Sequence, residues 1–281
     1  TTSLITISAS NFTNNCISDS ETAESIFAEE ASEEIDVFNS RFQDCGKDLY
    51  GYATIKLHAQ TAFIERNIFN FTSNQDACHA IIIKKYSDVN FVENQVYRTK
   101  CSGAFRYDPD TSYMSSLEKI RIERCIFDDC QGRNSRAIFC NLFTQNFTFF
   151  NNTIQNFSPF GSQEDSTGYL FVFEFPTTTT EFVVDSIIFR NLTTDSDFGG
   201  GCGLWIKSRQ MKRYTLHFKS CIFEDCHAVS NGKVTRECSN GRGGALQFGW
   251  TPSISDVDMV ISNCEFIRNV ADLDGGALCI M

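Results

Sequence analysis

The sequence predicts an all-β protein folded as a parallel β-helix, a solenoid of about nine coils with three short strands each. Three observations predict this fold. A short motif built around Phe recurs along the chain, two alternating apolar residues precede each copy, and small residues followed by another apolar pair come after it. One such repeat cannot bury its own apolar face, so the copies must stack on one another.

The recurring motif is clearest in "CIFDDC" at 125–130 and "CIFEDC" at 221–226. Related stretches are "NFTNN" at 11–15, "RFQDC" at 41–45 and "NFVEN" at 90–94, and weaker copies surround Phe69, Ile154 and Phe189. The last copy is centred on Phe266. We expect the Phe residues at these anchors to face inward and to stack as a ladder: Phe12, Phe42, Phe69, Phe91, Phe127, Phe189, Phe223 and Phe266.

The first strand of each coil is predicted from the apolar pairs that lie before each motif. Two apolar residues at a spacing of two form one face of a strand, and the three-residue step that follows changes the phase, as a corner does. The pairs are Ile5 and Ile7, Ile35 and Val37, Ala62 and Ile64, Ile120 and Ile122, Phe147 and Phe149, Phe182 and Val184, Leu216 and Phe218, and Met259 and Ile261. In the fourth copy, Lys84 and Tyr86 break the rule.

The third strand is predicted after the small residues, as in "GGAL" at 243–246 and 275–278. Glycine allows a tight corner there. The expected apolar pairs are Ile138 and Cys140, Leu170 and Val172, Leu204 and Ile206, Leu246 and Phe248, and Leu278 and Ile280. A two-sheet sandwich also has short alternating strands, but it does not explain why the same residue types recur in a fixed order.

Composition excludes several classes of protein. The 281 residues are 42% apolar and 21% charged, which suits a globular core rather than disorder. The net charge of -11 and the lack of any basic run make nucleic acid an unlikely partner. No apolar stretch reaches the length of about 18 residues that a membrane span needs. We therefore expect a soluble chain without nucleic-acid partners and without a direct membrane span.

The position three residues after the anchor carries Asn15, Asn94 and Asn269 in some copies, and Cys45, Cys130 and Cys226 in others. An Asn there can adopt a left-handed turn conformation and can pass amide hydrogen bonds between coils. A Cys is small enough to fill the same place when buried.

The 13 cysteines suggest a few disulfides together with several buried thiols. Equivalent residues on adjacent coils would have Cα atoms about 4.8 Å apart, within the range for a disulfide. The candidate pairs are Cys221 with Cys264 and Cys16 with Cys45. Metal binding is the poorer alternative, because the Cys pairs lack His ligands at a suitable spacing. We expect no metal and no other cofactor.

Six Asn-x-Ser/Thr sequons are candidates for N-glycosylation: Asn11, Asn70, Asn146, Asn151, Asn156 and Asn191. Asn11, Asn70 and Asn151 lie at odd offsets from inward residues and should therefore point outward. The other three lie near predicted corners or loops. Their use would place the protein in the secretory pathway, and chance matches are the alternative.

Phe-x-x-Asn together with Gly-Gly-Ala-Leu, both present at 266–269 and 275–278, resembles the motif pair of the polymorphic membrane protein repeats. This family is known from chlamydial surface autotransporters, and similar repeats occur in β-helical surface proteins of some protists. The resemblance covers essentially the whole chain, although Cys often replaces Asn. It implies an extracellular, right-handed β-helix that serves as an adhesin or surface scaffold. The membrane barrel of the bacterial family has no counterpart in this sequence.

An enzyme of the pectate-lyase type, a polysaccharide lyase or hydrolase, is the less favoured function on this fold. The most prominent acidic pairs, Asp128-Asp129 and Glu224-Asp225, are predicted to lie about 14 Å apart, because three coil steps separate them. Glycosidases need two carboxyl groups roughly 5–9.5 Å apart. We therefore expect no catalytic residues and no enzymatic activity.

Two non-enzymatic functions remain, an adhesin and a self-assembling structural filament or surface appendage. An adhesin would bind a protein or glycan ligand through loops at 17–34, 108–118, 159–168 and 227–242. A filament would self-associate through its coil ends. In either case we expect residues 1–281 to form a single domain, a fragment of a longer solenoid, at the cell surface or outside the cell.

Overall fold

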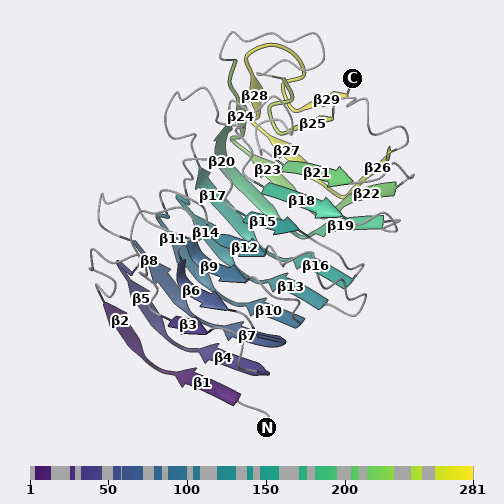
Figure 1. Ribbon diagram of the computed structural model, residues 1–281. Coiled ribbons are helices and arrows are strands. Elements are labelled where there is room, and N and C mark those ends of the chain that lie inside the picture. The colour runs from purple at the N-terminus through teal and green to yellow at the C-terminus, as the bar shows by residue number, and fades with distance from the viewer. Residues whose placement is uncertain are drawn as a thin grey trace.

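The computed structural model is an all-β solenoid of parallel strands, with no helix among the residues it describes. These residues are 4–13, 26–28, 33–45, 53–57, 59–71, 79–83, 88–99, 104–107, 119–130, 138–141, 146–157, 171–175, 181–194, 204–208, 214–230, 242–248 and 257–280. The strands stack from the N-terminal end to the C-terminal end along one axis (Figure 1).

Three parallel sheets run along this axis, and each strand pairs with the equivalent strand of the next coil. The first sheet contains β1 (Leu4–Ser8), β4 (Glu34–Phe38), β7 (Thr61–Glu65), β10 (Asp88–Val92), β13 (Lys119–Glu123), β16 (Asn146–Phe150), β19 (Glu181–Asp185), β22 (Tyr214–Lys219) and β26 (Val257–Ser262). The second contains β2 (Asn11–Thr13), β5 (Arg41–Gln43), β8 (Ile68–Asn70), β11 (Gln95–Tyr97), β14 (Ile126–Asp128), β17 (Thr153–Phe157), β20 (Ile188–Thr194), β23 (Ile222–Glu224) and β27 (Glu265–Ile267).

The third sheet contains β3 (Ile26–Ala28), β6 (Ala53–Leu57), β9 (His79–Ile83), β12 (Phe105–Tyr107), β15 (Ile138–Asn141), β18 (Phe171–Phe175) and β21 (Leu204–Ser208). Near the C-terminal end, β25 (Leu246–Phe248) pairs with β29 (Leu278–Ile280), and β24 (His227–Ala228) pairs with β28 (Val270–Ala271). The predicted order of three strands in a coil is therefore confirmed where the strands are described.

The register of the first sheet confirms the apolar pairs predicted from the sequence. Ile35 and Val37 lie opposite Ala62 and Ile64, and Phe182 and Val184 lie opposite Leu216 and Phe218. Most of these side chains are fully buried, whereas the residues between them point outward. The burial of these pairs against the other two sheets forms the core of the solenoid.

The fourth anchor was placed wrongly from the sequence. Phe91 lies in the first sheet, on β10, where it pairs with Ile64 and Ile122. The residue that pairs with Phe69 and Phe127 is Val96, on β11. With Val96 as the anchor, the fourth coil follows the rule that it had appeared to break, because Val89 and Phe91 then supply its inward pair.

The anchor column is an aromatic stack that Val96 and Ile154 interrupt. The rings of Phe12 and Phe42 have centroids 4.8 Å apart, and Phe42 lies 4.9 Å from Phe69. The same spacing of 4.9 Å recurs from Phe189 to Phe223 and from Phe223 to Phe266. Between the two runs, Phe127 instead approaches Phe91 of the first sheet at 6.2 Å.

The glycines of "GGAL" are required by close backbone contact. Gly243 has a φ of +64°, and a Cβ atom at Gly244 would lie 1.9 Å from the carbonyl oxygen of Gly276. This approach brings β25 and β29 into the expected register, with Leu246 opposite Leu278 and Phe248 opposite Ile280.

One apolar pair predicted for the third sheet was shifted by one residue. Phe171 and Phe173, rather than Leu170 and Val172, lie in register with Leu204 and Ile206.

Candidate functional site: the two corners of the second sheet

Two tight corners border the second sheet, and both are built in the same way. The first corner joins the first sheet to the second, and the second corner follows the second sheet. At each described corner a residue with positive φ precedes one whose side chain points inward, as Arg66 precedes Asn67 and Asp225 precedes Cys226. The left-handed residues are Ala9, Asn39, Arg66, Glu93, Arg124, Asn151, Ser186, Ser220 and Asn263 at the first corner, and Asp44, Arg98, Asp129, Asn156, Asn191, Asp225 and Arg268 at the second. The sequence predicted this conformation for the inward residue, which lies one position after the left-handed residue.

The inward residues of the first corner form a ladder of hydrogen bonds between coils. The amide Nδ2 of Asn94 donates to the carbonyl oxygen of Ile64 at 2.6 Å, and its Oδ1 accepts from the backbone N–H of Asn67 at 2.9 Å. Asn67 makes the same two bonds one coil earlier. Its Nδ2 donates to the carbonyl oxygen of Val37, and its Oδ1 accepts from the backbone N–H of Ser40. Asn94 therefore belongs to the first corner, not to the place after the anchor where we had expected it. These bonds satisfy buried backbone groups that the turn leaves outside the sheets.

Cysteine takes the place of asparagine in this ladder. The Cys125 thiol donates to the carbonyl oxygen of Phe91 at 3.4 Å, which is the position that an Asn side chain contacts in other coils. Cys221 contacts the carbonyl oxygen of Val184 at 3.3 Å in the same way, and its own N–H donates to the sulfur of Cys264 at 3.4 Å. The buried thiols thus have hydrogen-bond partners, whereas the sequence predicted only that a Cys would fill the space.

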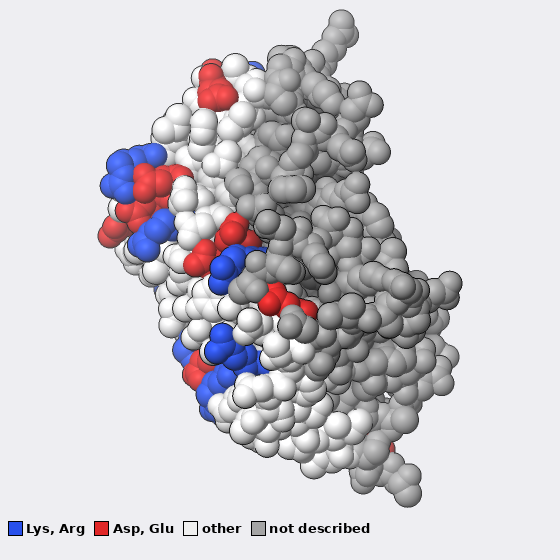
Figure 2. Space-filling view, turned by 90° about the vertical axis from the view of Figure 1, so that its left-hand side faces the viewer, with Lys and Arg blue, Asp and Glu red and all other residues white. Residues whose placement is uncertain are grey.

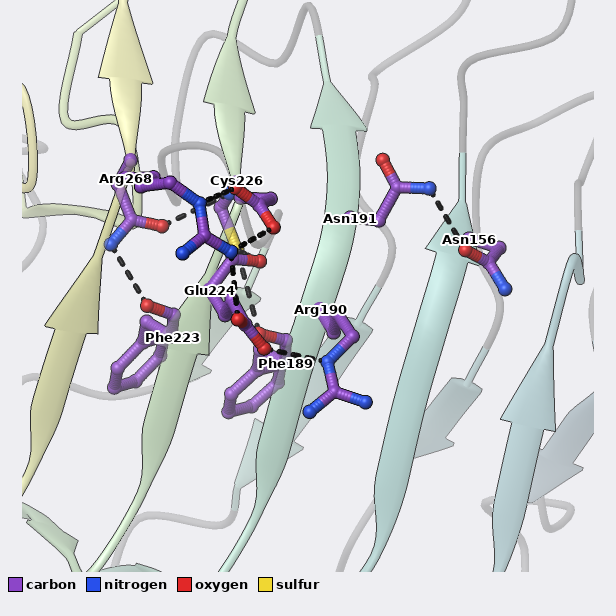
Figure 3. Close-up of polar contacts among 10 residues, drawn as sticks. Asn156, Phe189, Arg190, Asn191, Phe223, Glu224, Cys226 and Arg268 are labelled. Atoms are coloured by element: carbon purple, nitrogen blue, oxygen red, sulfur yellow. Dashed lines mark hydrogen bonds and ion pairs between the residues drawn. The ribbon is translucent and has the colours of Figure 1, made fainter.

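The second corner follows the same rule (Figure 3). The side chain of Cys226 contacts the carbonyl oxygen of Phe189 at 3.8 Å, and Asn269 Nδ2 donates to that of Phe223 at 2.9 Å. Cys45 and Cys130 contact the carbonyl oxygens of Phe12 and Val96, each at 3.4 Å. The predicted equivalence of Asn and Cys at this position is therefore explained by a shared acceptor.

Burial keeps these thiols protonated. It raises the pKa of Cys125, Cys130, Cys221 and Cys226 to about 12, because the thiolate would lose its hydration. Only a protonated thiol can donate to a carbonyl oxygen, so the raised pKa and the ladder bonds support each other.

The predicted Cys221–Cys264 disulfide is not formed. Both residues are free thiols, although they are equivalent residues of adjacent coils, and each contacts a backbone carbonyl oxygen instead. Cys45 is also free, while its candidate partner Cys16 lies outside the described residues. Asn15, another predicted ladder residue, lies outside them as well.

Charged side chains gather in separate clusters on the outside of the molecule, where acidic and basic groups adjoin (Figure 2). One such cluster lies at the second corner. Arg268 donates from Nε and Nη2 to the carboxylate of Asp225, both at 2.7 Å, and from Nη2 to Glu224 at 2.8 Å. Arg190 Nε contacts the other oxygen of Glu224 at 2.7 Å (Figure 3).

These ion pairs hold both carboxylates in the charged form. Hydrogen bonds from Arg190 and then Arg268 lower the pKa of Glu224, and those from Arg268 lower the pKa of Asp225. A general acid near neutral pH needs a raised carboxyl pKa. Glu224 and Asp225 are therefore better suited to ion pairs that join neighbouring coils than to proton transfer in catalysis. Sequence reasoning missed both arginines, since only the register of β20, β23 and β27 brings them beside Glu224.

The other acidic pair belongs to a polar row on the same corner. Asp128 accepts from Gln155 Nε2 at 2.9 Å and from Asn156 Nδ2 at 2.7 Å. Asn156 Oδ1 in turn accepts from Asn191 Nδ2 at 2.8 Å (Figure 3). Strands β17 and β20 lie between β14 and β23 in the sheet, so the two acidic pairs are separated by three strand steps, as predicted from the sequence.

Four of the six sequons lie at exposed positions. Asn11, Asn151, Asn156 and Asn191 are exposed, and Asn70 is half-buried beside Arg98, whose Nη2 donates to its Oδ1 at 2.9 Å. Asn146 is the first residue of β16, opposite Lys119. The four segments predicted as binding loops fall largely outside the described residues.

No three or more His, Cys, Asp and Glu side chains of the described residues are grouped as a metal ion would require. Within the same ranges, no helix has the length and hydropathy needed to cross a membrane. Comparisons of the chain with protein-family models, curated proteins and solved structures gave no match.

Proposed function

We propose that this chain is an extracellular or cell-surface scaffold of the adhesin type, without catalytic activity, built as a right-handed β-helix of nine coils. One observation carries the proposal. The hydrogen bonds that link neighbouring coils recur at both corners of the second sheet, with side chains of different chemistry in the same role. Such a frame holds its shape while the segments between the strands vary in length and sequence.

The outer charges support a scaffold rather than an enzyme. Glu224 and Asp225 are bound by Arg190 and Arg268 and are held ionised. These contacts join neighbouring coils, because Arg190 and Arg268 come from the coils on either side of Glu224. The order of nine strands in the first sheet supports the number of coils, and the motif pair at 266–269 and 275–278 supports the likeness to β-helical surface proteins.

A loop-replacement experiment tests the adhesin function. In two separate variants, residues 108–118 and 159–168 are replaced by short Gly-Ser linkers, and each variant is tested for binding to cultured cells and to immobilised glycans. The matched control exchanges outward residues of the first sheet, Thr148→Ser and Val183→Thr, and leaves the loops intact. We expect binding to fall in at least one loop variant while the circular dichroism spectrum is kept.

Three results would contradict the proposal. Undiminished binding in both loop variants would reject the adhesin function, and long end-to-end polymers of the intact chain in electron micrographs would favour the filament. Cleavage of a polysaccharide panel by the intact chain would reject the non-catalytic assignment.

A further inference from the structure

Five of the six sequons lie on one side of the solenoid. This side consists of the outer face of the second sheet and the two rows of left-handed residues at its borders, and we call it the sheet-2 facet. Asn11 is the first residue of β2, and Asn70 is the last residue of β8. Asn151 stands in the left-handed row of the first corner, and Asn156 and Asn191 stand in that of the second.

The preference of Asn for left-handed backbone positions does not by itself explain why the sequons cluster on this facet. The facet has four rows of at most nine positions in a chain of 281 residues. Left-handed conformation favours Asn, yet Asn39 and Asn263 occupy such positions without a Ser or Thr two residues later. Asn11 and Asn70 are sequons on strands, where no left-handed preference acts.

The facet has room for attached groups. Its corners are tight, so no long segment leaves the chain between the first sheet and the second. Four of the five Asn side chains are exposed, and the fifth, Asn70, is half-buried.

The amide nitrogens of the facet remain available for substitution. Asn156 Nδ2 donates one hydrogen to Asp128, and Asn191 Nδ2 donates one to Asn156. A carboxamide nitrogen carries two hydrogens, so each retains one that these bonds do not use. Asn70 uses its Oδ1 to accept from Arg98. A glycan could therefore be joined to any of the three without the loss of these hydrogen bonds.

We propose that the sheet-2 facet is the N-glycosylated face of this protein, an inference that rests on the proposed extracellular location. The donor class is an oligosaccharide carried on a lipid diphosphate. The bond between sugar C1 and the phosphate oxygen breaks, a bond from C1 to Asn Nδ2 forms, and the lipid diphosphate leaves while the amide loses one proton. Glycans on this facet would reserve the other sides of the solenoid for ligands.

Glycopeptide mapping tests the proposal. The chain is secreted from a eukaryotic cell line behind a heterologous signal sequence, and its N-glycans are removed enzymatically in heavy-oxygen water, which labels each previously occupied position. We expect label at most of Asn11, Asn70, Asn151, Asn156 and Asn191. A secreted, folded protein with label at Asn146 alone, or with no label, would overturn the inference.

Matched variants separate occupancy from folding. Thr193→Ala removes the sequon of Asn191 but keeps its amide beside Asn156, so the protein should lose the mass of one glycan and keep its melting temperature. Asn146→Gln should leave the mass unchanged except for the substitution itself. Because the heterologous signal fixes the route of export, these results do not depend on the native location. Surface labelling of the source cells tests that location, and an intracellular result there would contradict the proposed function alone.

Discussion

The first corner is held by amides in the coils of Asn67 and Asn94 and by thiols in the coils of Cys221 and Cys264, with Cys125 and Asn152 alternating between these two regions. Asn67 and Asn94 donate to carbonyl oxygens at 2.8 and 2.6 Å, and each Oδ1 also accepts a buried backbone N–H. Cys221 donates to the equivalent carbonyl oxygen at 3.3 Å, and the sulfur of Cys264 accepts the backbone N–H at 3.4 Å. The two regions share their geometry but not the strength of their bonds, because sulfur is the weaker donor and acceptor. Each of these two Asn side chains both donates to and accepts from the preceding coil.

The largest effect is expected where an amide is removed. Asn94→Ala leaves the N–H of Asn67 and the carbonyl oxygen of Ile64 buried without these bonds. Unsatisfied buried groups cost about 1–3 kcal/mol each, so we expect a loss of about 2–4 kcal/mol in the free energy of unfolding, measured with urea. Asn94→Cys is the matched variant and should recover part of the loss. If Asn94→Cys is no more stable than Asn94→Ala, the two side chains are not equivalent.

A smaller effect is expected at the thiol end. Cys221→Ala removes one weak donor and a small buried volume, for an expected loss of about 1–2 kcal/mol in the same urea measurement. Cys221→Asn should be more stable than Cys221→Ala, since it offers the amide that Asn67 uses. The opposite order would show that the C-terminal corner is shaped for sulfur.

High pH should weaken the thiol-held coils selectively. The pKa of Cys221 is about 12 in the folded protein and near 8.5 in an unfolded chain. A raised folded pKa means that its contribution is complete below about pH 8.5 and is lost as the pH rises toward about 12. Hydrogen exchange followed across this range should show the coils at Cys221 and Cys226 opening before those at Asn67 and Asn94. Simultaneous opening of both regions would contradict this assignment, as would rapid labelling of Cys221 by a thiol reagent at neutral pH.

The smallest effect is expected at the exposed ion pairs. Arg268→Gln removes the contacts to Asp225 and Glu224, and the loss of stability should be slight and should disappear at high salt. The lowered pKa values mean that the ion pairs stabilise the fold above the ordinary carboxyl pKa, and that this contribution is lost as the pH falls through the lowered values. Carboxyl titration by NMR should show the pKa of Asp225 rising in Arg268→Gln. An unchanged pKa would mean that the contact is not formed in solution.

Much of the fold could be predicted because inward residues recur with strand periodicity. The pairs of the first sheet, such as Ile35 and Val37, were correct, since each pair lies a fixed distance from its corner. The fourth coil was misplaced because "NFVEN" matches the motif locally, five residues before the true anchor Val96. The failed pair at Lys84 and Tyr86 was the signal of this error.

The site was less predictable than the fold. The sequence identified Cys226 and Asn269 as equivalent, but it did not reveal that both donate to a carbonyl oxygen of the preceding coil. The ion pairs join residues 34 and 43 positions apart, as from Arg190 to Glu224 and from Arg268 to Asp225. Such ion pairs can be predicted only when the length of every intervening coil is known.

The hydrogen bonds between corner residues form regardless of how many residues lie between their donor and acceptor in the sequence. The same contact between inward residues spans 27 positions from Asn67 to Asn94 and 43 from Cys221 to Cys264. A coil can therefore be lengthened between its corners, duplicated or deleted as a unit. The condition is that the corner residues of the coils that become neighbours can still form a hydrogen bond. Each coil is therefore a module that is joined to its neighbours by the same kind of hydrogen bond. A deletion variant that lacks the whole coil between Asn67 and Asn94 should still fold as a solenoid.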